Sequence, residues 1–113
     1  MRLYDHSQTT RWGYREISPR AVHEAGDAFV IDVREPPEYR AGHIPNARLV
    51  PLATVGEALG TWDRCADLVV VCRSGVRSGR VAEALVSAGF HRVMNLAGGM
   101  LAYEAEGLPV ARA

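Results

Sequence analysis

The sequence predicts an α/β domain in which five short strands form a parallel sheet covered by helices on both faces. Short runs rich in β-branched residues alternate with helical segments along the chain, which is the order that βαβ units produce. The clearest run, residues 68–72, is continuously apolar, as expected for a strand buried on both faces. With 113 residues, the chain has room for one compact domain.

The first half of the chain predicts three strands and two helical segments. Ser18 can cap a helix, Pro19 suits its first turn, and Gly26 ends it. The run 29–33 is apolar apart from the acid Asp32 near its end, which is typical of a buried parallel strand. The other elements are a strand at 14–17, a helical turn at 36–40 opened by two prolines, and a short strand within 47–52.

The second half predicts three helices and the two remaining strands. Residues 76–88 have Val81, Ala82 and Leu85 at the spacing of a core-facing helix, and Gly89 ends it. The others are a helix at 53–64, strands at 68–72 and 92–96, and a last helix that begins after Gly98-Gly99 and ends at Gly107. Because ligands bind at the carboxyl ends of strands in parallel sheets, the functional site is expected where 29–33 and 68–72 end.

Composition and charge argue against several function classes. The formal net charge is zero and the arginines are scattered, so we expect neither a nucleic-acid partner nor a membrane partner. Residues 1–13 are polar and aperiodic; they predict a flexible N-terminal extension without a secretory signal, and the domain is expected at 14–113. The two cysteines imply no disulfide framework, so a reducing cytoplasm is the expected location.

The residues after the clearest strand form a loop suited to anions and to a reactive thiol. Positions 72–78 read Cys-Arg-Ser-Gly-Val-Arg-Ser. Gly75 can adopt a positive φ, so that successive N–H groups point inward as an anion-binding nest beside a helix N-terminus. Arg73 and Arg77 flank this nest. A lone cysteine at a strand end is more often a small buried hydrophobe, but this setting predicts a lowered pKa for Cys72 and a thiolate nucleophile.

With this loop, two further motifs make the sequence similar to the rhodanese family. Residues 72–78 resemble the active-site loop of rhodanese domains. Residues 32–47, with Asp-Val-Arg-Glu at the start and Gly-His-Ile-Pro near the end, resemble the family's N-terminal signature. Residues 95–110, with Asn-Leu-Ala-Gly-Gly-Met at the start, resemble its C-terminal one. The resemblance covers about 17–110 and implies the rhodanese-like fold, a five-stranded parallel sheet with helices on both sides.

The resemblance also implies roles for individual residues. Cys72 would accept a sulfane sulfur and hold it as a persulfide. The substrate-binding residues would be those of the nest: Arg73, Ser74, Gly75, Val76 and Arg77. Their backbone N–H groups would cradle the sulfur and an oxyanion, and Arg77 would close the loop and help to bind the anion. Asp32 and Arg34 match a paired acid and arginine that would order the pocket, with Ser78 as a further supporting residue.

The leading hypothesis is therefore a thiosulfate sulfurtransferase. It would take sulfur from a small anionic donor such as thiosulfate and pass it to cyanide, a thiol or a protein acceptor, with no cofactor and no metal. The alternative is a persulfide carrier that serves a protein partner in cofactor biosynthesis or RNA thiolation. A phosphatase-like or arsenate-reducing activity and a non-catalytic recognition module also stay open. Cell-cycle phosphatases of this fold have Cys-x5-Arg, one residue longer than the Cys-x4-Arg of this chain.

A few residues invite other interpretations. His43 is a candidate base or metal ligand, but its place in a turn favours a structural hydrogen bond. Cys65 is a candidate for resolving an oxidised Cys72. Glu38 is attributed to charged surface and loop ordering. Two positions depart from the family pattern: Asn46 stands where glycine is frequent and tolerates positive φ, and Tyr103 stands in place of a tryptophan in an expected core position.

Overall fold

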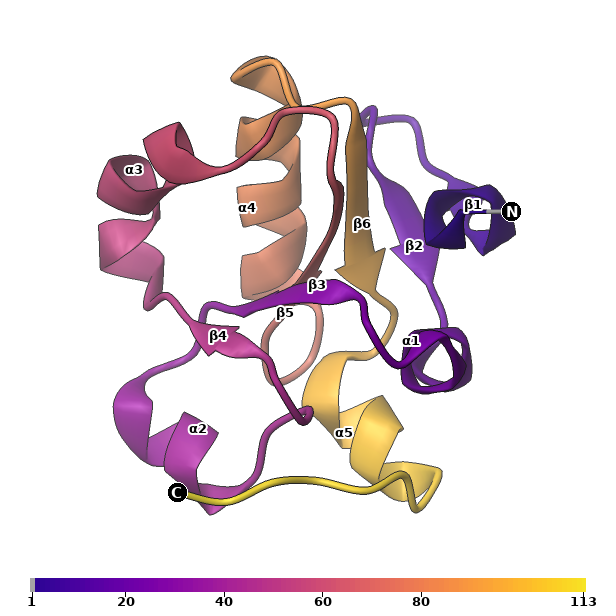
Figure 1. The fold of residues 1–113 in the computed structure, drawn as a ribbon, viewed down its shortest axis with the longest axis vertical. Coiled ribbons are helices and arrows are strands. Elements are labelled where there is room, and N and C mark those ends of the chain that lie inside the picture. The colour runs from indigo at the N-terminus through magenta and orange to yellow at the C-terminus, as the bar shows by residue number, and fades with distance from the viewer. Residues whose placement is uncertain (1) are drawn as a thin grey trace.

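The fold is built on a six-stranded sheet in the order β1-β2-β6-β5-β3-β4, seen in a computed structural model that describes residues 2–113 (Figure 1). The five strands β2 to β6 run parallel, and β1 pairs antiparallel with β2 at one edge. The predicted α/β class with five parallel strands is confirmed, and the sixth strand is an addition. The strands are β1 (Gln8–Thr9), β2 (Arg15–Ile17), β3 (Phe29–Asp32), β4 (Arg48–Leu49), β5 (Asp67–Val71) and β6 (Arg92–Leu96).

Helices cover both faces of the sheet, as the alternating pattern predicts. The α-helices are α1 (Pro19–Ala25), α2 (Pro36–Ala41), α3 (Val55–Ala58), α4 (Val76–Ser87) and α5 (Gly99–Ala105). Ser18 caps α1 by accepting a hydrogen bond from the Ala21 N–H at 3.2 Å. The prediction of one continuous helix over 53–64 is wrong. That helix is replaced by η2 (Leu52–Thr54), α3 and η3 (Leu59–Thr61), because glycines at 56 and 60 are poor helix formers.

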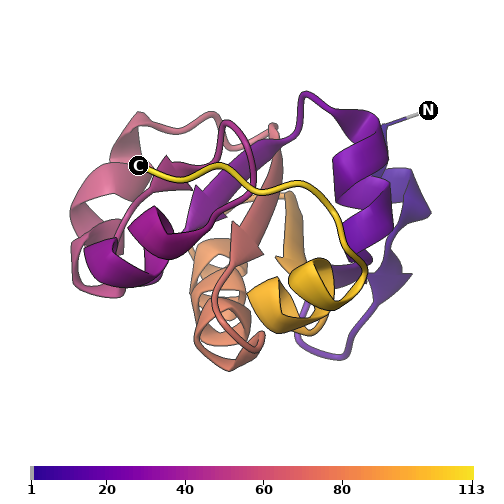
Figure 2. The same ribbon diagram turned by 90° about the horizontal axis from the view of Figure 1, so that it is seen from below.

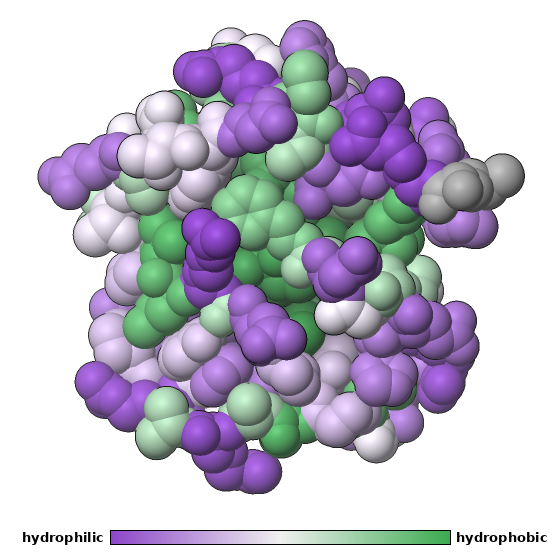
Figure 3. All heavy atoms as spheres, viewed as in Figure 1, coloured by the Kyte–Doolittle hydropathy of each residue, from purple (hydrophilic) through white to green (hydrophobic). Residues whose placement is uncertain are grey.

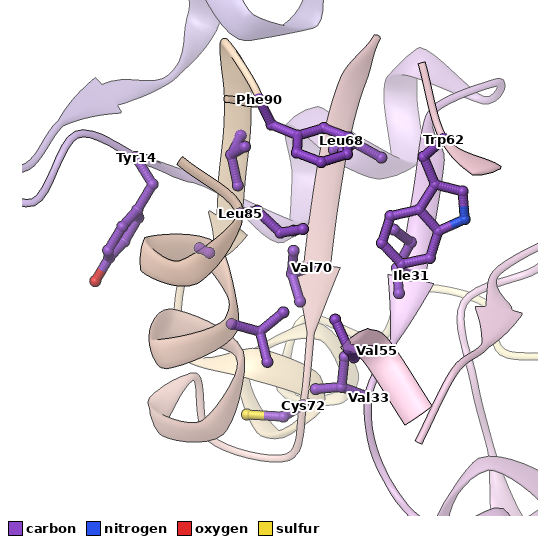
Figure 4. Close-up of a cluster of buried hydrophobic side chains, with 13 residues drawn as sticks. Tyr14, Ile31, Val33, Val55, Trp62, Leu68, Val70, Cys72, Leu85 and Phe90 are labelled. Atoms are coloured by element: carbon purple, nitrogen blue, oxygen red, sulfur yellow. The ribbon is translucent and has the colours of Figure 1, made fainter. Parts of the chain in front are cut away.

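Two apolar cores lie on the two faces of the sheet. On one face, α3 and α4 pack over side chains such as Ile31, Val70 and Val93 (Figure 4). On the other face, α1 and α5 pack over the alternate side chains, with Tyr103 fully buried among them. Figure 2 shows α5 beside the sheet and the last residues running past α2. On the face in Figure 3, hydrophobic atoms gather near the centre and hydrophilic residues surround them.

The N-terminal segment is docked on the sheet, where the sequence predicts a flexible extension. Residues 3–6 form the 3-10 helix η1 (Leu3–His6), and β1 follows it. Arg2 forms an ion pair with Asp67 at 2.7 Å, and the Arg15 guanidinium lies 4.4 Å from the centre of the Tyr4 ring. Met1, the first residue of the expected extension, lies outside the described residues. An ion pair and a cation–π contact therefore hold a segment whose polar sequence predicts flexibility.

The sheet order places the expected site at its centre. β5 lies between β6 and β3, and Val71 at its end is the register partner of Asp32 at the end of β3. The segments that follow these strands, 72–78 and 33–35, therefore leave the sheet at the same edge. None of the helices within residues 2–113 has the length and apolar character needed to cross a membrane.

Candidate active site

Cys72 follows the central strand and its sulfur points toward the first turn of α4 (Figure 4). The residue is fully buried. Gly75, with φ of 99°, turns the chain so that its N–H lies 3.1 Å from Cys72 Sγ. From α4, the Ser78 N–H and hydroxyl lie 3.4 and 3.3 Å from the same sulfur. The loop therefore wraps the thiol in donors, which is the arrangement that a thiolate needs.

These contacts decide the ionisation of Cys72. Burial raises the pKa of the thiol, because the charged form loses its hydration. Hydrogen bonds from the Ser78 hydroxyl and from the N–H groups of Ser78, Gly75 and Ser74 act in the opposite direction and together outweigh burial. The pKa of Cys72 is thus lowered from its ordinary value. A lowered pKa increases the thiolate fraction near neutral pH, and the thiolate is the nucleophilic form.

The start of α5 fixes the other side of the loop. The N–H groups of Met100 and Leu101 donate to the carbonyls of Cys72 and Arg73 at 2.9 and 3.0 Å. A side chain at position 99 would place its Cβ 2.5 Å from both carbonyl oxygens. Only glycine lets α5 approach this closely, and Gly99 has a positive φ as well. This contact gives the Gly-Gly pair of the C-terminal motif a role in shaping the site.

Asp32 and Arg34 form a buried ion pair at the end of β3. Arg34 Nη2 lies 2.8 Å from Asp32 Oδ2, and Nε lies 2.9 Å from Oδ1. The Arg34 backbone N–H donates to Asp32 Oδ1 at 3.1 Å, and Arg34 Nη2 donates to the Gly42 carbonyl oxygen at 2.8 Å. The side chains are only 0% and 6% exposed. The structure thus brings together the two residues that the sequence pairs.

Arg77 is paired with a carboxylate, a contact that the sequence does not predict. Its Nη1 and Nη2 each lie 3.2 Å from one carboxylate oxygen of Glu38, at the start of α2. This hydrogen bond lowers the pKa of Glu38, against the opposing effect of burial. Both side chains remain about one-third exposed. Sequence reasoning assigned Glu38 to the charged surface; its position in the N-terminal motif is the signal that could have linked it to the loop.

The remaining nest residues are exposed toward solvent. Arg73, Ser74 and Val76 are exposed, and Val76 reaches 63%. A pocket of about 210 Å³ beside the loop is lined by residues that include Arg34, Glu38 and Arg73. Of the predicted substrate-binding residues, only Arg73 lines this opening, which has charges of both signs.

A polar chain that sequence reasoning missed lies behind the loop. The Ser78 hydroxyl lies 2.5 Å from Asn95 Oδ1, and Asn95 Nδ2 donates to Glu16 Oε2 at 2.9 Å. Ser78 and Asn95 are buried, and Glu16 is half-buried. The signal was available for Asn95, which opens the C-terminal motif. Nothing in the local sequence marks Glu16, because only the pairing of β2 with β6 brings it there.

Other candidate residues prove structural. His43 Nδ1 lies 2.7 Å from the Tyr39 carbonyl oxygen, and its ring stacks on the Tyr39 ring at 3.6 Å. Asn46 has a positive φ of 69°. The Tyr103 hydroxyl donates to the Pro109 carbonyl at 2.8 Å. Residues 2–113 contain no group of three or more acidic, histidine or cysteine side chains placed to hold a metal ion.

Cys65 is exposed and lies at the opposite end of the sheet from Cys72. The strand between them, Asp67–Val71, alone spans about 13 Å at roughly 3.3 Å per residue. A disulfide requires Cα atoms within about 7 Å of each other. Cys65 therefore cannot resolve an oxidised Cys72 of the same molecule.

Comparison with known proteins assigns the family. The model of the rhodanese-like domain matches residues 19–106. The putative sulfurtransferase YtwF of Bacillus subtilis is 38% identical over 99 residues, which cover 84% of this chain and 95% of that protein. The thiosulfate sulfurtransferase GlpE of Pseudomonas fluorescens is 37% identical over 89 residues, which cover 76% and 81%.

A solved structure gives the same result. The crystal structure of a rhodanese-related protein from Thermoplasma volcanium has a TM-score of 0.80 at 31% identity and covers 87% of this chain and 98% of that one. The resemblance carried by the three sequence motifs is confirmed. The chain therefore belongs to the rhodanese-like domain family, among relatives that are named sulfurtransferases.

Proposed function

We propose that this protein is a thiosulfate sulfurtransferase that carries the transferred sulfur on Cys72. The observation that supports this most strongly is the buried thiol, which faces three hydrogen-bond donors and has a lowered pKa. In the first step, the Cys72 thiolate attacks the outer sulfur of thiosulfate. The new S–S bond forms as the bond to the sulfonate sulfur breaks, and sulfite leaves with that electron pair.

In the second step, a nucleophile such as cyanide attacks the outer sulfur of the Cys72 persulfide. The S–S bond breaks, thiocyanate leaves, and the Cys72 thiolate is restored. The N–H groups of Gly75 and Ser78 suit this chemistry because they stabilise negative charge at the Cys72 side chain without a side-chain base. Both steps conserve charge and need no oxidant, reductant or cofactor.

The experiment that tests this function compares thiosulfate with an aryl phosphate as substrates of the same protein. A phosphoryl group brings three oxygens that all need donors, whereas a persulfide brings one terminal sulfur. The four residues between Cys72 and Arg77 form a small nest, so we expect thiosulfate-to-cyanide turnover and negligible phosphate hydrolysis. Phosphate hydrolysis at a rate comparable to sulfur transfer, measured on the purified protein, would contradict the proposal.

Glu38→Gln is expected to lower the KM for thiosulfate by about threefold with little change in kcat. The change removes a negative charge beside the opening and releases the Arg77 guanidinium to an anionic donor. Glutamine still accepts the hydrogen bond from the Glu35 N–H, so the start of α2 is kept.

The matched control for this prediction is Glu104→Gln. Glu104 lines the same pocket as Glu38 but is not the partner of Arg77. Steady-state kinetics with thiosulfate and with an uncharged persulfide donor separate the effects. A KM for thiosulfate that is unchanged in Glu38→Gln, or that falls equally in the control, would show that Arg77 does not recognise the donor's charge.

A second candidate function is delivery of the same persulfide to a protein acceptor. It is favoured by an apolar groove of about 500 Å³ that begins at Val76 and Arg77, directly after the nucleophile loop. The exposed Leu52 and Val76 lie in this groove, and Arg80 adds a positive charge. Fast transfer to a protein thiol together with slow transfer to cyanide would favour this function.

A further inference from the structure

The polar chain behind the loop connects an edge strand to the nucleophile. Glu16 on β2 and Asn95 on β6 are register partners in the sheet, and their side chains point to the face that α4 covers. Asn95 Nδ2 donates to Glu16 Oε2 at 2.9 Å and to the Gly75 carbonyl at 3.1 Å. Asn95 Oδ1 then faces the Ser78 hydroxyl at 2.5 Å. Ser78 Oγ lies 3.3 Å from Cys72 Sγ.

The acceptors beside Asn95 fix the orientation of its side-chain amide. The carboxylate of Glu16 and the carbonyl of Gly75 are both acceptors, so the amide nitrogen of Asn95 must face them. Rotating the amide would place Oδ1 against the Gly75 carbonyl oxygen and leave both acceptors without a donor. Asn95 Oδ1 is thereby held toward Ser78 as an acceptor.

The Ser78 hydroxyl has one proton, and two neighbouring atoms can accept it. Asn95 Oδ1 accepts this proton in one orientation, and the Cys72 thiolate accepts it in the other. When Cys72 is a thiol, its own S–H can donate to Ser78 Oγ and leave the Ser78 proton on Asn95. When Cys72 ionises, the two acceptors compete. Because Ser78 is fully buried and Asn95 is 4% exposed, bulk water does not replace the missing donor.

We propose that Glu16 is a positioning residue that acts through Asn95 on the single hydroxyl proton of Ser78, and so sets how strongly the Cys72 sulfur is held as a thiolate. A carboxylate that accepts from Asn95 Nδ2 polarises the amide and strengthens Oδ1 as an acceptor. The proton is drawn away from the sulfur, which leaves a more basic and more nucleophilic thiolate. The inference rests on the proposed function only for the use made of that thiolate.

Other charged groups lie near Glu16 and near Cys72, and they act without the hydrogen bonds through Asn95 and Ser78. Glu16 lies near Tyr14, whose pKa is raised by burial and by the charges of Glu16 and Glu83. At the other end, the guanidinium of Arg77 lies near the charges of Cys72 and Asp32. An effect of Glu16 on Cys72 must therefore be separated from general electrostatics. Glu83, an exposed carboxylate on α4 near Tyr14, provides the matched control.

The test measures how the alkylation rate of Cys72 by iodoacetamide depends on pH, in a Cys65→Ser background so that only Cys72 reacts. Glu16→Gln is expected to move the midpoint to lower pH and to reduce the plateau rate slightly. Below the midpoint, the rate should rise about threefold, the size expected for a fraction of one hydrogen bond. Glu83→Gln should leave the midpoint in place.

A double-mutant cycle with Ser78→Ala decides how Glu16 acts. Ser78→Ala alone should move the midpoint to higher pH, because the hydroxyl donor is lost. In that background Glu16→Gln should have no further effect. An unchanged midpoint in Glu16→Gln, or the same shift with and without Ser78, would overturn the proposal.

Glu16→Ala guards against an effect of the glutamine side chain itself. It removes the carboxylate but leaves the backbone pairing of β2 with β6 in place, and it must move the midpoint in the same direction. A midpoint that stays in place in this variant would equally contradict the proposal. Because the assay contains no sulfur donor, a failure of sulfur transfer in the wild-type protein would bear on the proposed function and not on this inference.

Discussion

Cys72→Ser is expected to lower sulfur transfer from thiosulfate to cyanide by at least about three orders of magnitude. A serine hydroxyl stays protonated in the same nest, and it cannot form a persulfide. The substitution is close to isosteric, so the Gly75 N–H and the Ser78 hydroxyl can still donate to the side chain at position 72. Steady-state thiocyanate production measures the loss, and circular dichroism checks that the fold is intact.

The matched control is Cys65→Ser, which removes the other cysteine. Cys65 is exposed at the far end of β5, so this variant should keep the wild-type rate. If Cys72→Ser retained more than a few percent of the activity, or if Cys65→Ser lost it, Cys72 would not be the nucleophile.

Arg34→Ala is expected to lower the free energy of unfolding by about 3–5 kcal/mol. It leaves the Asp32 carboxylate buried at 0% exposure without its bidentate partner, and it removes the donor to the Gly42 carbonyl. For a chain of this size, the melting temperature should fall by more than about 10 °C. Urea unfolding measures the free energy, and thermal unfolding measures the midpoint.

Arg40→Ala is the control for this loss of stability. Arg40 lies on α2 near the same part of the fold, but its side chain is exposed, so a change below about 0.5 kcal/mol is expected. A loss in Arg34→Ala no larger than in the control would mean that the buried pair does not hold this end of β3.

The elements that repeat a local pattern could be predicted from the sequence. The strand at 92–96 has the predicted bounds, and α4 differs from prediction only in its last residue. In α4, apolar periodicity and the glycine at 89 that ends the helix coincide, so local and tertiary preferences agree. The segment 53–64 fails this condition, because Leu59 and Trp62 pack on the core while the glycines at 56 and 60 interrupt the helix.

The parts that depend on distant partners could not be predicted. Docking of residues 2–9 depends on Arg2 meeting Asp67, some sixty positions away, which no local pattern records. In the site, the motifs placed Cys72 and the buried pair of Asp32 and Arg34 correctly at one sheet edge. They did not reveal that Arg77 is paired with Glu38. That pairing follows from how α2 and α4 meet, which spacing along the chain does not encode.

The most direct test of sulfur transfer through Cys72 is the intact mass of the protein after mixing with thiosulfate. We predict that wild-type protein gains the mass of one sulfur atom, that peptide mapping places this atom on Cys72, and that cyanide removes it. The lowered pKa of Cys72 increases the thiolate fraction that is available for loading near neutral pH. A wild-type protein that gains no sulfur, or gains it only on Cys65, would contradict sulfur transfer through Cys72.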